Sequence, residues 1–238
     1  MSEFRLSFPA CVIAGKNRLT ADDLLLLRRY TFPEGIRSAE DVIVILALDT
    51  LCPEKCTGWR DYFVESLADY IVNRCHPAGS LDTMNAVWFE QVFAKDRVIC
   101  SPHELELLLH LIDLAPPAPA ALTALALDQL AIALAERRGP LQACRAAEHA
   151  SLSLDDIAYV RRVLKHACSN GRLLLDERER TTLLRIDGAM KGIRVPEWLD
   201  ILAEAGIATE TAPPEAPTTS ARWLQVPDSF FLDNQRVA

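Results

Sequence analysis

Apolar residues recur at helical spacing along three successive stretches of the chain, and short breaks rich in proline, glycine and capping residues separate them. The first stretch, residues 19–74, begins LTADDLLLLRRYTFPEGIRSAEDVIVILALDTL, and residues 81–138 and 152–208 repeat its order of helix, turn, apolar helix, turn and helix. Apolar residues that return every three or four positions share one face of an α-helix. We therefore predict an all-α fold in which three related units, of about three helices each, stack in one array.

Capping residues mark where the predicted helices begin. A Ser, Thr or Asp side chain accepts a hydrogen bond from a free N–H of the first turn, and an acid three residues later can return one. The helix after Ser38 is apolar on nearly every side, so we expect it to be the buried member of its pair. We predict N-caps at Thr20, Ser38, Ser101, Ser153 and Asp176, and a last helix opened by Pro196.

Acidic residues recur at matching positions of the three units. Asp49, Asp113 and Asp187 lie 11, 12 and 11 positions after the predicted caps of their helices. Further matches relate Trp59, Asp61 and Glu65 to Trp198, Asp200 and Glu204, each pair 139 positions apart, and Glu65 to Asp128 of the second unit.

Two interpretations of Asp49, Asp113 and Asp187 are open: a functional acidic cluster, or a structural hydrogen bond repeated in each unit. An acid at a helix C-terminus opposes the helix dipole and needs a compensating partner. We therefore favour the structural interpretation, with backbone N–H groups of the next helix start as donors.

Different composition marks the two ends of the chain. Residues 1–18 form a lead-in of mixed character, which we expect to include a short extended segment. Residues 209–220, TETAPPEAPTTS, have the composition of an extended linker. The last stretch, 221–238, is too apolar for a disordered tail, and we expect it to dock onto the chain's own helices, a partner or a second copy through Trp223, Leu224, Phe230, Phe231 and Leu232.

Composition excludes several classes of protein. Half of the residues are hydrophobic (50%), too many for a disordered chain, and the formal net charge of −8 argues against nucleic acid as a partner. The most apolar stretch, within 121–135, is interrupted by Asp128 and Gln129 and is too short to cross a bilayer, so we expect no membrane insertion. Seven scattered cysteines are typical of reduced thiols, and we expect a cytoplasmic protein.

The turns between the first two helices of the first and third units are candidate cation sites. They hold Glu34, Gly35 and Glu40 in the first unit, and Asn170, Gly171, Asp176 and Glu177 in the third. Oxygen ligands around a glycine-centred loop can bind a hard divalent cation, with Glu34, Glu40, Asp176 and Glu177 as ligands. A C-cap glycine followed by an N-cap box explains the same residues without a metal, and we favour that interpretation.

These turns resemble those of the TerB-like tellurite-resistance family, an all-helical family with an acidic-Gly turn followed by Glu. The resemblance covers two of the three units and implies a stacked-helix fold with a metal-associated, stress-related role. It also extends to bacterial proteins built from such units. The chain has Glu34-Gly35 and Asn170-Gly171 where the family has Asp-Gly, and Lys95-Asp96-Arg97, without glycine, in the second unit.

Zinc binding and catalysis have weaker support. Cys52, Cys56, Cys75 and Cys100, with His76 and His103, offer zinc ligands, but they lack the tight paired spacing of structural zinc sites, and buried thiols explain them as well. The chain contains no P-loop, G-x-S-x-G or H-E-x-x-H motif. His103 and His110, seven residues apart on one helix face, are the candidates if the protein is an enzyme.

Together these patterns favour a non-enzymatic helical-repeat protein that binds a protein partner or a second copy, as an adaptor or regulator. The alternative is a TerB-like, metal-binding, stress-associated protein.

Overall fold

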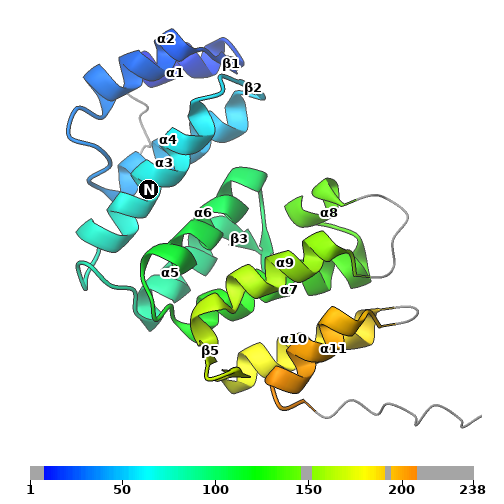
Figure 1. Ribbon diagram of the computed structural model, residues 1–238. Coiled ribbons are helices and arrows are strands. Elements are labelled where there is room, and N and C mark those ends of the chain that lie inside the picture. Colours follow the sequence, from blue (N-terminus) through cyan, green and yellow to red (C-terminus); the bar gives the residue numbers. More distant parts are fainter. Residues whose placement is uncertain (1–7, 146–151, 191–193, 208–238) are drawn as a thin grey trace, which may run out of the picture. The chain divides into compact units, whose positions relative to one another are not determined.

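The computed structural model describes residues 8–145, 152–190 and 194–207, and eleven α-helices dominate this part of the chain (Figure 1). The predicted all-α class is confirmed. The predicted linker 209–220 and the tail residues Trp223, Leu224, Phe230, Phe231 and Leu232 lie outside the described residues.

The first part of the fold contains four α-helices, two of which continue into a π-helical turn, and one parallel strand pair. Its elements are α1 (Phe8–Gly15), β1 (Arg18–Leu19), α2 (Ala21–Leu26), η1 (Leu27–Thr31), α3 (Ala39–Leu51), β2 (Glu54–Lys55), α4 (Trp59–Asp69) and η2 (Tyr70–Arg74).

The second part contains an antiparallel hairpin between its first two helices. Its elements are α5 (Thr83–Phe93), β3 (Ala94–Lys95), β4 (Val98–Ile99), α6 (Pro102–Leu114), α7 (Ala120–Glu136) and α8 (Pro140–Cys144).

The third part repeats the hairpin between helices. Its elements are α9 (Leu154–Val163), the 3₁₀ turn η3 (Lys165–Ala167), β5 (Cys168–Ser169), β6 (Arg172–Leu173), α10 (Glu177–Ala189) and α11 (Pro196–Glu204).

Local capping explains where most helices begin. Six of the described helices start with a reciprocal capping box, in which the N-cap side chain accepts from the N3 backbone and the N3 side chain accepts from the N-cap backbone. All five predicted N-caps are confirmed, and Asp82 of α5 is a sixth. The pairs are Thr20–Asp23, Ser38–Asp41, Asp82–Asn85, Ser101–Glu104, Ser153–Asp156 and Asp176–Glu179.

The third helix of each part begins differently. Helices α4, α7 and α11 follow Gly58, Pro119 and Val195, none of which makes a side-chain cap. Each part of the chain therefore has the order capped helix, capped helix, uncapped helix. In the third part the first helix ends at Val163, before the predicted end at Cys168, because a 3₁₀ turn and the hairpin follow.

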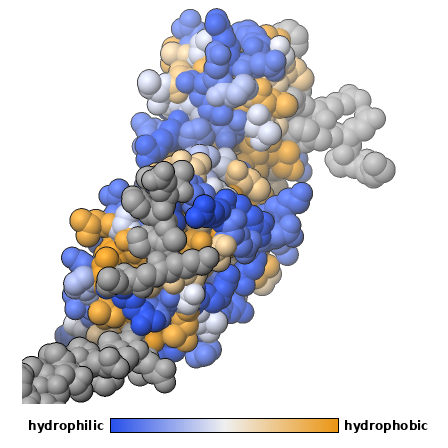
Figure 2. Space-filling view, turned by 90° about the vertical axis from the view of Figure 1, so that its right-hand side faces the viewer, coloured by the Kyte–Doolittle hydropathy of each residue, from blue (hydrophilic) through white to orange (hydrophobic). Residues whose placement is uncertain are grey.

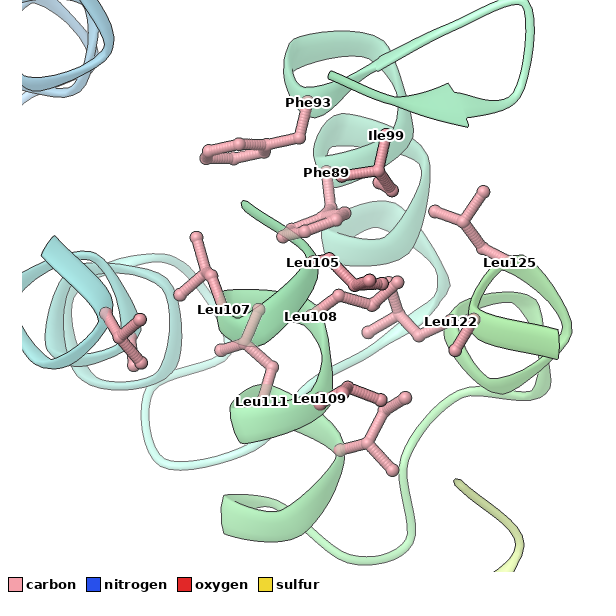
Figure 3. Close-up of a cluster of buried hydrophobic side chains, with 14 of the residues drawn as sticks. Phe89, Phe93, Ile99, Leu105, Leu107, Leu108, Leu109, Leu111, Leu122 and Leu125 are labelled. Atoms are coloured by element: carbon pink, nitrogen blue, oxygen red, sulfur yellow. The ribbon is translucent and has the colours of Figure 1, made fainter. Parts of the chain in front are cut away.

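The most deeply buried helix is α7, not the helix after Ser38. Every residue of α7 from Leu122 to Leu134 is buried, because α5, α6, α8, α9 and α10 all pack against it. In α3, by contrast, Ile43 and Leu51 are 46% and 47% exposed, so the expectation of a helix buried nearly all round is wrong there. Figure 3 shows the apolar side chains of α6 meeting Phe89 and Phe93 of α5 and Leu122 and Leu125 of α7.

The lead-in is helical rather than extended over its described residues. Ala10 and Ile13 of α1 are buried, and α1 packs against α3 and η1. Extended backbone is limited to Arg18–Leu19, which pairs with Glu54–Lys55. The burial of two apolar residues three positions apart stabilises a helix that the short sequence FPACVIAG did not reveal.

Apolar side chains also reach the surface. Leu25 and Tyr30 in the first part, Met84 in the second and Leu154 and Leu174 in the third are all more than 60% exposed. Figure 2 shows hydrophobic patches interspersed with hydrophilic residues on the face that it presents. None of the helices in the described ranges combines the length and the apolarity that crossing a bilayer demands.

Candidate functional site at the α7–α10 interface

Polar side chains are concentrated where α10 packs on α7, the pair of helices with the most extensive contact in the described fold. Helix α7 contributes Thr123, Asp128 and Gln129, which are buried in an otherwise apolar helix. Buried polar groups destabilise a fold unless they are hydrogen-bonded, so each of these must have a partner. Their partners define two neighbouring candidate sites.

The first site is built around the Asp128 carboxylate, whose side chain is 0% exposed. Oδ1 accepts hydrogen bonds from Arg185 Nη1 at 2.6 Å and from Thr182 Oγ1 at 3.2 Å, both on α10. Oδ2 accepts from Arg97 Nη2 in the hairpin between β3 and β4. Two guanidinium groups thus compensate one buried negative charge, which is the condition for keeping that charge inside a protein.

Arg97 is held in an unusual backbone conformation. It and Asp96 form the two-residue hairpin turn with φ values of 64° and 53°, the left-handed region that type I′ turns require. The equivalent turn between β5 and β6 uses Asn170-Gly171, a combination suited to that geometry. Arginine has no intrinsic preference for it, so tertiary contacts must hold Arg97 there.

Gln129 supplies those contacts. Its Nε2 donates to the Arg97 carbonyl at 2.8 Å, and its Oε1 accepts from the Ile99 backbone N–H at 3.0 Å. Adjacent residues of α7 therefore fasten the hairpin by its backbone, through Gln129, and by a side chain, through Asp128.

A cavity of about 550 Å³, which we call the arginine pocket, opens beside Asp128. Arg97, Arg178 and Arg185 line it, together with the hydroxyls of Thr181 and Thr182 and the carboxylates of Glu90 and Glu177. Arg97 and Arg185 are 57% and 47% exposed, so both guanidinium groups reach from the buried carboxylate into the pocket.

The second site is an apolar cleft of about 260 Å³ where α6, α7, α9 and α10 meet. Ile112, Pro117, Ala118, Val163 and Leu174 contribute apolar walls. The nearly buried Glu179 also lines the cleft, and His166 and Ser169 are the exposed polar residues among its lining. We call this the apolar cleft.

Glu179 and Thr123 satisfy each other in the apolar cleft. The hydroxyl of Thr123 is within hydrogen-bond distance of both Glu179 Oε1 and the Ala120 carbonyl, yet it has one proton. Burial raises the pKa of Glu179, despite the hydrogen bonds from Thr123 and from the Asp176 backbone. A protonated Glu179 that donates to Thr123, while Thr123 donates to Ala120, satisfies every group.

A third polar cluster lies between α3 and α6. Asp49 Oδ1 accepts from Trp59 Nε1 at 2.7 Å, lies 2.8 Å from His103 Nδ1 and is 3.5 Å from Lys55 Nζ. Burial alone would raise the pKa of Asp49, but the hydrogen bonds from His103 and Trp59, with the charge on Lys55, hold it below its ordinary value. The next residue along α6, Glu104, is buried, and burial together with the nearby Asp49 raises its pKa to about 7.

The predicted cation ligands are not brought together. Glu34 pairs with Arg37, and Glu40 is exposed on α3. Asp176 caps α10 by accepting from the backbone of Arg178 and Glu179, and Glu177 lies at the arginine pocket. Within residues 8–145, 152–190 and 194–207, no three His, Cys, Asp or Glu side chains are placed to hold one metal ion.

The predicted zinc ligands are likewise separate. Cys52 is buried and its thiol donates to the Ile13 carbonyl at 3.7 Å, whereas Cys100 is exposed. His103 contacts Asp49 and lies against the Phe63 ring, with 5.8 Å between ring centroids, and the half-buried His110 lines none of the pockets described above.

The repeated acids have side-chain partners, not the backbone donors that we expected. Asp113 accepts from Arg162 at 3.0 Å. Asp187 accepts from Trp198 Nε1 at 3.0 Å and bidentately from Arg194. They form no acidic cluster, because a separate positively charged or indole partner holds each one.

The other register acids occupy unlike environments. Glu65 is exposed, Asp128 is fully buried, and Glu204 pairs with Arg161 at 2.9 Å. Correspondence in sequence register therefore does not carry over into an equivalent contact at this position.

No protein-family model, curated protein or solved structure matches this chain, so the site is interpreted from its geometry.

Sequence reasoning missed Arg97, Arg185, Thr123 and Glu179 as site residues. One signal was present: Thr123, Asp128 and Gln129 interrupt an otherwise apolar helix, and polar residues in such a helix must find partners. The partners themselves come from elements 31 to 57 positions away, and no local pattern identifies them.

Proposed function

We propose that this chain is a non-enzymatic protein of three related helical units that acts as an adaptor or regulator, and that it binds an apolar side chain of a protein partner in the apolar cleft. The observation that carries the proposal is the state of the cleft's acidic groups. Glu179 bonds to Thr123, and Asp176 caps α10, so both already have partners within the chain.

What the cleft offers a ligand is mainly apolar wall. Pockets that bind ligands are typically apolar with a few polar groups that fix orientation. Here His166 and Ser169 are the exposed polar residues beside that wall, suited to the backbone of a bound peptide. Leu174, 70% exposed, extends the apolar surface outward.

The three-unit arrangement is supported by two recurrent features. Each part has two capped helices followed by an uncapped one. The Trp–Asp hydrogen bond of the first part, Trp59 to Asp49, recurs as Trp198 to Asp187 in the third. Stacked units of this kind present the junctions between helices as recognition surfaces.

Selection from a displayed library of short random peptides tests the proposal. The full chain is the bait, and the affinity of each enriched peptide is measured against two variants of equal added bulk. Ala118→Trp fills the cleft, whereas Ala158→Trp adds the same ring to an exposed position of α9 that does not line the cleft.

We expect enriched peptides to share an apolar anchor residue and to bind the Ala118→Trp variant at least roughly tenfold more weakly, because a filled pocket excludes the anchor. Ala158→Trp should leave binding unchanged. Peptides that bind both variants equally, or no enrichment at all, would overturn the proposal.

A further inference from the structure

We propose that the arginine pocket is a binding site for a phosphoryl group, carried by free phosphate or by a phosphate monoester. This site is separate from the apolar cleft and does not rest on the proposed adaptor function. Three lines of structure converge on it: unused guanidinium donors, a rigid anchor beneath them, and a cavity large enough for the ligand.

The donors come first. A guanidinium group has five N–H donors in a planar fork that matches phosphate oxygens. Arg97 and Arg185 each use one nitrogen on Asp128, which leaves the remaining donors of each group for a ligand. In the described chain nothing hydrogen-bonds or ion-pairs with the Arg178 guanidinium, which lines the same pocket with the hydroxyl of Thr181.

The anchor comes second. Asp128 is fully buried on the most enclosed helix, so it fixes the positions of both arginines that it binds. The left-handed backbone of Arg97 adds a conformational penalty that the fold accepts, and such strain is concentrated at binding sites. Arginines held in place before binding lose less conformational entropy when a ligand arrives.

The acids at the pocket set the charge of the ligand. Glu90 lies 3.9 Å from Arg97, and Glu177 lines the same pocket. Their negative charge repels any anion, so a singly charged carboxylate gains little. A phosphate dianion, with three acceptor oxygens for three arginines, gains enough from charge-assisted hydrogen bonds to overcome the repulsion.

Binding is tested on the full chain by isothermal titration calorimetry with inorganic phosphate, with O-phosphoserine and with succinate. The decisive variant is Arg178→Ala, since Arg178 has no partner to lose and alanine favours a helix. Its control is Arg172→Ala, which removes the same charge from an exposed residue of the β5–β6 hairpin outside the pocket.

We expect phosphate or phosphoserine to bind the native chain and Arg172→Ala alike, and to bind Arg178→Ala roughly tenfold more weakly. Glu177→Gln should tighten binding roughly twofold, because it removes a repelling charge. Binding of phosphoserine but not inorganic phosphate would assign the monoester as the ligand, and the reverse would assign free phosphate.

Three results would each overturn the proposal. They are no heat of binding from either phosphate compound, equal affinity of the Arg178→Ala and Arg172→Ala variants, and succinate binding as tight as phosphate binding. Because these ligands are small anions, none of these results bears on the peptide test of the apolar cleft.

Discussion

The indole N–H of Trp59 donates a hydrogen bond of 2.7 Å to Asp49 Oδ1, so the first residue of α4 compensates the acid near the end of α3. Trp198 and Asp187 repeat this relationship at 3.0 Å, between α11 and α10. Both indoles are fully buried. The same contact therefore closes the turn between the second and third helices in two parts of the chain.

Replacing either tryptophan by phenylalanine should destabilise the fold. Trp59→Phe keeps an aromatic ring in the core but removes the donor to a buried carboxylate, so we expect a loss of about 2 kcal/mol in the free energy of unfolding. Trp198→Phe should cost a similar amount. Urea denaturation at neutral pH measures both.

Trp88→Phe is the control for these variants, because Trp88 is half-buried and its indole makes no hydrogen bond with the described residues. A loss from Trp88→Phe as large as that from Trp59→Phe would mean that ring volume, and not the hydrogen bond, is responsible.

Glu104 should make stability depend on pH. Its pKa is about 7 in the folded chain, against an ordinary value of 4.5 that applies after unfolding. Between these values the folded chain binds the proton and the unfolded chain does not, so stability falls as pH rises. The contribution is complete below pH 4.5, is lost as the pH rises through 7, and amounts to about 3 kcal/mol.

The Glu104→Gln variant separates this contribution from other titrations. Glutamine still accepts from the Ser101 backbone N–H, which preserves the capping box. From pH 5 to pH 8 we expect the native chain to lose more stability than Glu104→Gln, whereas Glu197→Gln, at an exposed site, should follow the native chain. Parallel curves for the native chain and Glu104→Gln would contradict the raised pKa.

The backbone strain at Arg97 can be measured by comparing two variants. Arg97→Gly and Arg97→Ala both lose the ion pair with Asp128, but only glycine adopts a φ of 64° without penalty. We expect the glycine variant to be more stable than the alanine variant by about 1 kcal/mol.

The same pair of substitutions at Arg161 should give the opposite order. Arg161 lies inside α9, where glycine costs about 1 kcal/mol relative to alanine. If alanine were favoured at both positions, Arg97 would carry no strain. Thermal and urea unfolding of the four variants provides the comparison.

Gln129→Leu should loosen the hairpin between β3 and β4. The substitution removes the acceptor of the buried Ile99 N–H and a donor to the Arg97 carbonyl, and unsatisfied buried groups cost about 1–3 kcal/mol each. We expect faster hydrogen exchange at residues 94–99 as well as lower global stability. Gln91→Leu, at an exposed position of α5, should change neither.

Helix boundaries were the most predictable part of the fold. Thr20, Ser38, Ser101, Ser153 and Asp176 all cap helices as expected, because a capping box depends only on residues three positions apart. The cation and zinc hypotheses found no converging ligands among the described residues, since the same acids and thiols serve as caps, ion-pair partners and core residues.

Local sequence by itself determined the helical class, the position of most helix starts and the recurrence of Trp and Asp in two units, since each follows from contacts over a few residues. Tertiary structure alone decided that α7 is the central helix, that Asp128 binds Arg97 and Arg185, and that Asp96-Arg97 forms a left-handed turn. Burial and ion pairing depend on which distant segments pack together, and the chain's composition at any one position leaves that choice open.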